Sequence, residues 1–93
     1  MQVLLSGVVD LNRNDPAHLY VQLYRALREA ILADALKPGD RIPPSRAAAD
    51  DLSVSRRTVL AAFDQLTGEG FLESRQGSGT RVANWRRQIE ASG

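Results

Sequence analysis

The sequence predicts an α+β fold in which three helices precede a two-stranded β-hairpin. Apolar residues recur at three- and four-residue steps over most of the chain, and Pro, Gly and Ser divide that region into three helical segments. Two short runs of strand-forming residues then flank a Gly-Ser-Gly stretch. The 93 residues, of which 43% are hydrophobic, suffice for one compact core. Because cysteine is absent, packing alone must hold that core together.

The N-terminal part divides into an arm and a helix. We expect residues 1–14 to form an arm or a short strand, because short apolar runs are followed by three polar residues. Asp15 and Pro16 are suited to the N-cap and the first position of a helix that Pro38-Gly39 ends. Its apolar stripe is predicted to comprise Leu19, Leu23, Ala26, Leu27, Ala30 and Ile31.

Two short helices joined by a tight turn are expected next. Two prolines favour extended backbone over residues 41–45, and Ser45 can cap a helix from Arg46 to about Leu52. After the turn, Ser55 caps a third helix that ends near Gly68 or Gly70. The apolar face of this third helix consists of Val59, Ala62, Phe63 and Leu66.

Residues 71–75 and 80–83 are the two strand candidates, and residues 76–79 form the turn between them. The order of three helices and a hairpin matches a winged helix-turn-helix, whose third helix fits the major groove of B-DNA. We assign this domain to residues 15–83. Residues 84–93, which include Trp85 and Arg86-Arg87, are interpreted as the start of a linker or the end of the expressed chain.

Charge and residue inventory exclude several functions. The formal net charge is only +1, although eleven of the twelve basic residues are arginine; a high genomic G+C content would produce the same bias. With His18 as the only histidine and Lys37 as the only lysine, the common catalytic triads, metal sites and cofactor sites lack parts. The adjacent carboxylates Asp50 and Asp51 point apart on a helix. We therefore expect no enzyme, no cofactor and no metal in this chain, and no signal or membrane segment, which indicates a cytoplasmic location.

The candidate binding residues lie at the start of the third helix. Ser55, Arg56, Arg57 and Thr58 supply two hydroxyl groups and two guanidinium groups, which suit phosphate and base edges. One arginine is expected to read the groove while the other holds the backbone, and the pattern does not say which. The alternative is that both arginines form a solvated surface. Arg46 either joins this surface or pairs with Asp50, four residues later.

The hairpin tip is a second candidate contact. Gln76, Gly77 and Ser78 form a small polar tip that can approach a sugar-phosphate chain, with Arg75 and Arg81 beside it. A plain surface hairpin is the alternative. Acidic residues of the domain must lie on other faces if phosphate is bound, because phosphate repels them.

Six segments in register resemble the DNA-binding domain of GntR-family bacterial transcription regulators, most closely the MocR/PdxR branch. They are Leu19-Tyr20-Val21-Gln22-Leu23, Leu36-Lys37-Pro38-Gly39-Asp40-Arg41-Ile42-Pro43, Ser45-Arg46, Val54-Ser55-Arg56-Arg57-Thr58-Val59, Leu66-Thr67-Gly68-Glu69-Gly70-Phe71-Leu72 and Gly77-Ser78-Gly79-Thr80.

The resemblance implies sequence-specific binding of a double-stranded DNA operator. Its implied contacts are Arg46, Ser55, Arg56, Arg57, Thr58, Gln76, Gly77 and Ser78. It also implies a homodimer in the intact regulator, with the isolated domain a monomer that binds weakly and with strong salt dependence. In the MocR/PdxR branch, pyridoxal phosphate belongs to a large C-terminal domain that these residues do not include.

The chain departs from the family pattern at four places. Pro44 stands where the family usually has serine, Ala48 replaces a common core leucine, and Ser53 replaces a common turn glycine. Leu60 stands where other branches carry a DNA-reading arginine, so their base preference does not transfer. A winged-helix module that binds protein rather than DNA is the alternative function, since a fold does not dictate a ligand.

Overall fold

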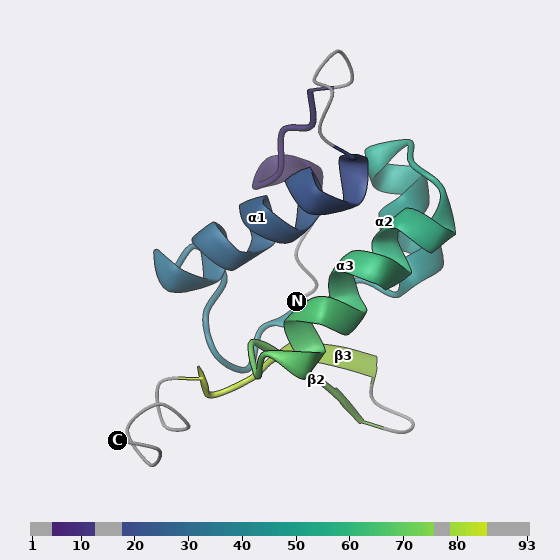
Figure 1. Cartoon of the computed structure of the whole chain (residues 1–93). Coiled ribbons are helices and arrows are strands. Elements are labelled where there is room, and N and C mark those ends of the chain that lie inside the picture. Colours follow the sequence, from purple (N-terminus) through teal and green to yellow (C-terminus); the bar gives the residue numbers. More distant parts are fainter. Residues whose placement is uncertain (1–4, 13–17, 76–78, 86–93) are drawn as a thin grey trace.

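A computed structural model describes residues 5–12, 18–75 and 79–85 (Figure 1). Its elements are a 3-10 turn η1 (Leu5–Gly7), helices α1 (Leu19–Leu32), α2 (Ser45–Leu52) and α3 (Arg56–Gly68), and strands β1 (Arg41–Ile42), β2 (Leu72–Arg75) and β3 (Gly79–Val82). The three helices pack together, and the small sheet lies beside the C-terminal end of α3. This arrangement confirms the predicted α+β fold with a winged helix-turn-helix order of elements.

The sheet has three antiparallel strands in the order β1-β3-β2, one more than the hairpin that the sequence predicts. In the hairpin, Leu72 pairs with Val82 and Arg75 with Gly79, so both strands lie within a residue of their predicted positions. The additional strand β1 pairs Arg41 with Arg81 across forty residues of chain. A two-residue strand has no periodicity of its own, and its partner is remote in sequence. It was therefore predicted only as extended backbone.

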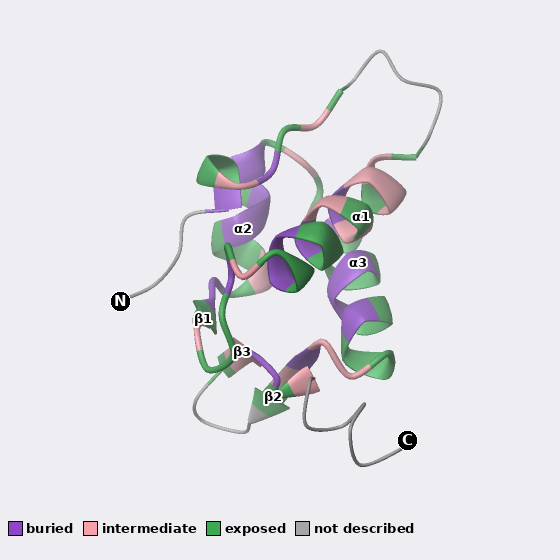
Figure 2. Ribbon diagram, turned by 90° about the vertical axis from the view of Figure 1, so that its left-hand side faces the viewer, coloured by how far each residue is buried: buried purple, intermediate pink, exposed green. Residues whose placement is uncertain are grey.

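The core forms where the apolar faces of the three helices meet above the sheet, and Figure 2 shows these buried faces turned toward one another. On α1, Leu23, Leu27 and Ile31 are almost completely buried, while Leu19 at the start of the stripe is half-buried. Burial of one such side chain stabilises the fold by about 1.5–3 kcal/mol. The predicted apolar face of α3 is confirmed in full, since all four of its members are buried: Val59, Ala62, Phe63 and Leu66.

The three helices begin differently from one another. Helix α1 starts at Leu19, because His18 has extended backbone angles (φ −59°, ψ 141°); the predicted cap residues Asp15 and Pro16 lie outside the described residues. The predicted cap at Ser45 is wrong, since Pro44 holds the cap position and Ser45 is already helical. Proline at residue 44 favours extended backbone and so postpones the helix by one residue. The Ser55 cap of α3 is confirmed, because its Oγ accepts the backbone N–H of Thr58 at 3.1 Å.

All three helices end with the same two backbone hydrogen bonds around a residue in the left-handed region. The N–H of that residue donates to the carbonyl three positions earlier, and the next N–H donates to the carbonyl five positions before it. In α1 this residue is Asp34 (φ 63°), so the helix ends at Leu32 and not at Pro38-Gly39 as predicted. In α2 it is Ser53 (φ 54°), at the place of the family's common glycine. In α3 it is Gly70 (φ 86°). Only glycine adopts this conformation without steric cost, so Asp34 and Ser53 each give up part of the stability that their turns supply.

The N-terminal segment packs against the domain. Among residues 5–12 there is no strand; Leu5–Gly7 form a 3-10 turn, and Leu5 is completely buried. The Ser6 N–H donates to Asp51 Oδ2 of α2 at 2.9 Å. Val9 is also buried, and Trp85 packs against the same core. The core therefore includes residues on both sides of the predicted domain range 15–83.

In the part of the chain that the structure describes, every helix is too short or too polar to span a lipid bilayer.

Candidate nucleic-acid interface

The turn between α2 and α3 places the first turn of α3 on the surface. Ser53 reverses the chain after α2, and Ser55 then caps α3 through the hydrogen bond to the Thr58 N–H. The Thr58 hydroxyl lies 2.8 Å from Ser55 Oγ, so the two hydroxyls are also bonded to each other. Together these bonds hold the first helical turn in one conformation. The predicted residues of this segment, 55–58, are therefore brought together as the sequence suggested.

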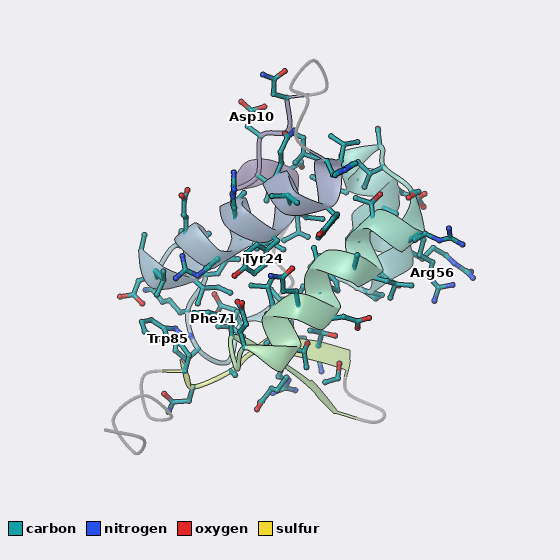
Figure 3. The ribbon with its side chains drawn as sticks, viewed as in Figure 1. Asp10, Tyr24, Arg56, Phe71 and Trp85 are labelled. Atoms are coloured by element: carbon teal, nitrogen blue, oxygen red, sulfur yellow. The ribbon has the colours of Figure 1, made fainter. Side chains whose placement is uncertain are left out.

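Arg56 lies on the side of α3 that faces α2. Its Nε–H donates to Ser45 Oγ at 3.0 Å, and both side chains lie near the surface. Figure 3 shows Arg56 at the outer end of α3. Because Nε is bonded within the domain, the two terminal Nη groups are the part of this guanidinium that remains for an external acceptor.

Arg57 lies on the opposite flank, beside the start of α1. It contributes to an open hollow of about 450 Å³ whose lining residues are His18, Leu19, Tyr20, Arg57, Thr58 and Ala61. The His18 and Tyr20 rings stack with centroids 6.4 Å apart, and Tyr20 is 38% exposed. His18 is exposed, and the sequence did not connect His18 or Tyr20 with the arginines. Only the packing of α1 on α3 brings these residues together. The one feature of the sequence that could have indicated the contact was Tyr20, an aromatic residue within the segment Leu19–Leu23.

Arg46 is exposed on the first turn of α2. Within the described ranges it makes no ion pair with Asp50, so that alternative is not realised. Asp51 accepts the Ser6 N–H, whereas Asp50 faces solvent, which agrees with the expectation that the two carboxylates point apart. Ser45, which precedes Arg46 in α2, is hydrogen-bonded to Arg56. Arg46 and Arg56 therefore lie at the same polar end of the domain.

Asp64 is the acidic residue of α3 that lies nearest to this surface in sequence. It is exposed and follows Arg57 by seven residues, so it lies about 20° from Arg57 around the helix axis. Asp64 therefore lies on the same side of α3 as Arg57. The Asp64 carboxylate lies two helical turns beyond Arg57 and ends the basic surface formed by the arginines at the start of α3.

The base of the wing is described, but its tip is not. Gln76, Gly77 and Ser78 lie outside the described residues, so the structure does not place these predicted contacts. Arg81 in β3 is half-buried and stands between Arg41 and Glu73 in the sheet register. The paired strands thus orient the hairpin, and Arg81 is part of the sheet rather than of a freely exposed flank.

At the other end of α3, polar groups are engaged within the domain (Figure 3). Tyr24 Oη donates to Glu69 Oε1 at 2.5 Å, and this hydrogen bond, helped by burial and by the carboxylate charge, raises the pKa of Tyr24 above its ordinary value of 10.0. The Arg28 guanidinium lies 5.8 Å from the centre of the Phe71 ring. Phe71 in turn contacts Trp85, with ring centroids 5.9 Å apart. These contacts join α1, α3 and the chain after the sheet.

Comparison with known proteins identifies the domain. Residues 19–82 match the model of the gntR family of bacterial regulatory proteins. The chain belongs to the GntR family. This GntR domain is the DNA-binding domain of a transcription regulator and is not an enzyme, which confirms the predicted class.

Related sequences agree with the MocR/PdxR resemblance. The GntR domain is 52% identical over 73 residues to the probable rhizopine catabolism regulatory protein MocR of Rhizobium meliloti, covering 78% of this chain and 15% of that protein. It is 40% identical over 74 residues to the pyridoxine biosynthesis transcriptional regulator PdxR of Corynebacterium glutamicum, covering 80% of this chain and 16% of that protein. The chain thus spans only a small part of the length of these relatives.

Solved structures agree with the fold. YtrA from Sulfolobus acidocaldarius, a GntR-family transcription factor, superposes with a TM-score of 0.77 at 28% identity, over 91% of this chain and 92% of that chain. The AraR DNA-binding domain in complex with its operator ORX1 superposes with a TM-score of 0.68 at 28% identity, over 81% of this chain and 96% of that chain.

Proposed function

We propose that the domain binds a double-stranded DNA operator sequence-specifically, with the first two turns of α3 in the major groove and the wing on the flanking backbone or minor groove. The observation that carries this proposal is the pair of exposed arginines on the capped first turn of α3, next to the turn from α2. An α-helix fits the major groove, and guanidinium groups suit both guanine edges and phosphates. The similar AraR DNA-binding domain is solved in complex with its operator, which supports operator binding by this domain.

The two arginines have different roles in this proposal. The hydrogen bond from Arg56 Nε to Ser45 leaves two Nη groups, and a pair of guanidinium N–H groups can bind O6 and N7 of guanine. Arg57 lies beside the hollow on the α1 side, where the Thr58 hydroxyl and the Tyr20 ring offer further contacts to a sugar-phosphate chain. We therefore assign base reading to Arg56 and backbone contact to Arg57.

The remaining predicted contacts bind the backbone in this proposal. Arg46 stands at the start of α2 and reaches a phosphate on the other side of the groove, while Ser55 and Thr58 hold the first turn of α3. The wing residues Gln76, Gly77 and Ser78 follow from the family resemblance alone. Asp64 ends the contact surface, because its carboxylate repels phosphate.

The intact regulator extends beyond this domain in our proposal. We expect a homodimer that binds paired half-sites in the bacterial cytoplasm, where the DNA is, whereas the isolated domain binds one half-site as a monomer. We keep residues 15–83 as the DNA-binding unit, with residues 1–14 as an arm, of which Leu5 and Val9 pack on the core, and 84–93 as the start of a linker. Pyridoxal phosphate would belong to a further domain, because Lys37, the chain's only lysine, is exposed in a turn and does not line the hollow beside Arg57.

The test is selection of bound duplexes from a randomised pool at about 50 mM salt, followed by affinity measurements on the selected half-site. Arg56→Ala should weaken binding by about 1–3 kcal/mol and relax selectivity at one base pair. Arg57→Ala should weaken all sequences alike and reduce the salt dependence by about one phosphate contact. Arg25→Ala, which removes the same charge from an exposed position on α1, is the matched control.

Two outcomes would contradict the proposal. Retention of DNA without enrichment of any sequence would mean that the isolated domain binds by charge alone. Absence of retention, together with binding to protein that is insensitive to salt, would favour the protein-interaction module instead.

A further inference from the structure

Ser45 has an unusual role for a serine at the start of a helix. It occupies the first helical position of α2, and Pro44 holds the cap position without a side-chain hydrogen bond. Ser45 Oγ instead accepts the Nε–H of Arg56 on α3 at 3.0 Å. The hydroxyl is therefore directed across the helix-turn-helix toward a residue eleven positions later, and does not cap its own helix.

This bond restricts one of the long arginine side chains of the proposed interface. An arginine that binds DNA loses the rotational freedom of a long side chain, and the loss opposes binding. The contact with Ser45 fixes the direction of the guanidinium before DNA arrives and leaves both Nη groups for an acceptor. The Ser45 hydroxyl hydrogen also remains for donation, because the oxygen acts here only as an acceptor.

We infer that Ser45 is a positioning residue for base recognition: its hydroxyl orients the Arg56 guanidinium toward the DNA. The inference rests on the proposed function, since it assumes that Arg56 reads a base. It predicts that selectivity at the base pair read by Arg56 depends on a side chain that lies on another helix.

A purely structural role for Ser45 predicts a different result. If the hydroxyl only joined α2 to α3, its removal would lower the unfolding temperature and weaken binding to every sequence alike. Both partners lie near the surface, and alanine is a better helix former than serine, so Ser45→Ala is expected to leave the unfolding temperature nearly unchanged.

The experiment compares Ser45→Ala, Ser45→Thr, Arg56→Ala and the double variant Ser45→Ala/Arg56→Ala with the unmodified chain. Affinities are measured for the selected half-site and for duplexes in which each base pair is replaced in turn. Ser45→Ala should weaken binding about 3- to 10-fold, and its selectivity should relax at the same base pair as in Arg56→Ala. Ser45→Thr should restore both, because threonine keeps the hydroxyl. The double variant should bind no more weakly than Arg56→Ala alone.

Ser6→Ala, which removes an exposed hydroxyl from η1, is the matched control and should bind like the unmodified chain. Additive effects of Ser45→Ala and Arg56→Ala, or an equal loss at every base pair, would overturn the inference. If Arg56→Ala itself left all affinities unchanged, the proposed role of Arg56 would fail instead. The two failures are thus distinguishable.

Discussion

The two ends of α3 use their polar side chains in opposite ways. At the C-terminal end, Tyr24 is bonded to Glu69 and the Arg28 guanidinium lies over Phe71. At the N-terminal end, Arg56 makes one hydrogen bond within the domain, and Arg57 borders an open hollow. Figure 3 shows Arg56 at one end of α3 and Phe71 near the other.

We expect the polar groups at the C-terminal end of α3 to contribute to stability, and the arginines at its N-terminal end to contribute to DNA binding. Polar groups whose partners lie within the domain join α1, α3 and the segment after the sheet, so their loss should be seen in unfolding. Guanidinium groups that face outward contribute little to folding, because water solvates them well without a partner. Their loss should be seen in DNA affinity. A net charge of +1 is therefore compatible with DNA binding, since the arginines of the proposed interface are gathered at the starts of α2 and α3.

The largest effect is expected from Phe71→Ala at the C-terminal end. Phe71 contacts both the Arg28 guanidinium and the Trp85 ring and is half-buried against the core. Its removal should lower the free energy of unfolding by about 2 kcal/mol and Tm by about 10 °C. DNA affinity, measured well below that Tm, should not change. A variant of normal stability with weakened DNA binding would reverse the assignment of the two ends.

A smaller loss of stability is expected from Tyr24→Phe, which removes the hydrogen bond to Glu69. Near neutral pH the variant should be about 1 kcal/mol less stable than the unmodified chain. The hydrogen bond raises the pKa of Tyr24 in the folded state, so its stabilising effect is present below pH 10.0 and is lost as the pH rises through the raised pKa. Urea unfolding of both proteins over this pH range measures the difference. A stability difference that stays constant above pH 10.0 would show that the phenol proton is not involved.

The smallest effect is expected from Asp64→Asn, at the boundary between the two ends. The exposed Asp64 carboxylate follows Arg57 along the same side of α3 and repels the phosphates that the arginines attract. Its neutralisation should raise DNA affinity about threefold at low salt, with a smaller gain at high salt. Glu29→Gln, an exposed acidic position near the end of α1, should give no comparable gain. Equal gains from both substitutions would mean that only net charge matters.

Local chemistry explains the parts of the fold that were predicted correctly. The Ser55 cap and the four buried residues of α3 follow from hydrogen-bonding groups and spacing within one helix, which the sequence displays directly. The two strands of the hairpin were found within a residue for the same reason. The start of α2 and the end of α1 were wrong, because Pro44 takes the cap position and Asp34 adopts a left-handed conformation that aspartate seldom adopts.

The candidate site was predictable only in part. Residues 55–58 are consecutive, so their grouping on one helical turn needed no tertiary information. The sequence left open whether Arg46 pairs with Asp50 and which of the two arginines reads a base. It also gave no indication of the bond between Ser45 and Arg56, since its partners belong to different helices.

By itself the sequence determined the order of helices and strands, the apolar faces that meet in the core, and the polar character of the first turn of α3. These features depend on contacts between residues a few positions apart, whose geometry a helix or strand imposes. Tertiary structure alone decided that β1 joins the sheet, that Leu5 enters the core, and that Arg56 and Arg57 face different neighbours. These outcomes depend on which distant surfaces become adjacent when apolar area is buried. Because the hydrophobic effect is not directional, a short run of residues does not show which partner it will pack against.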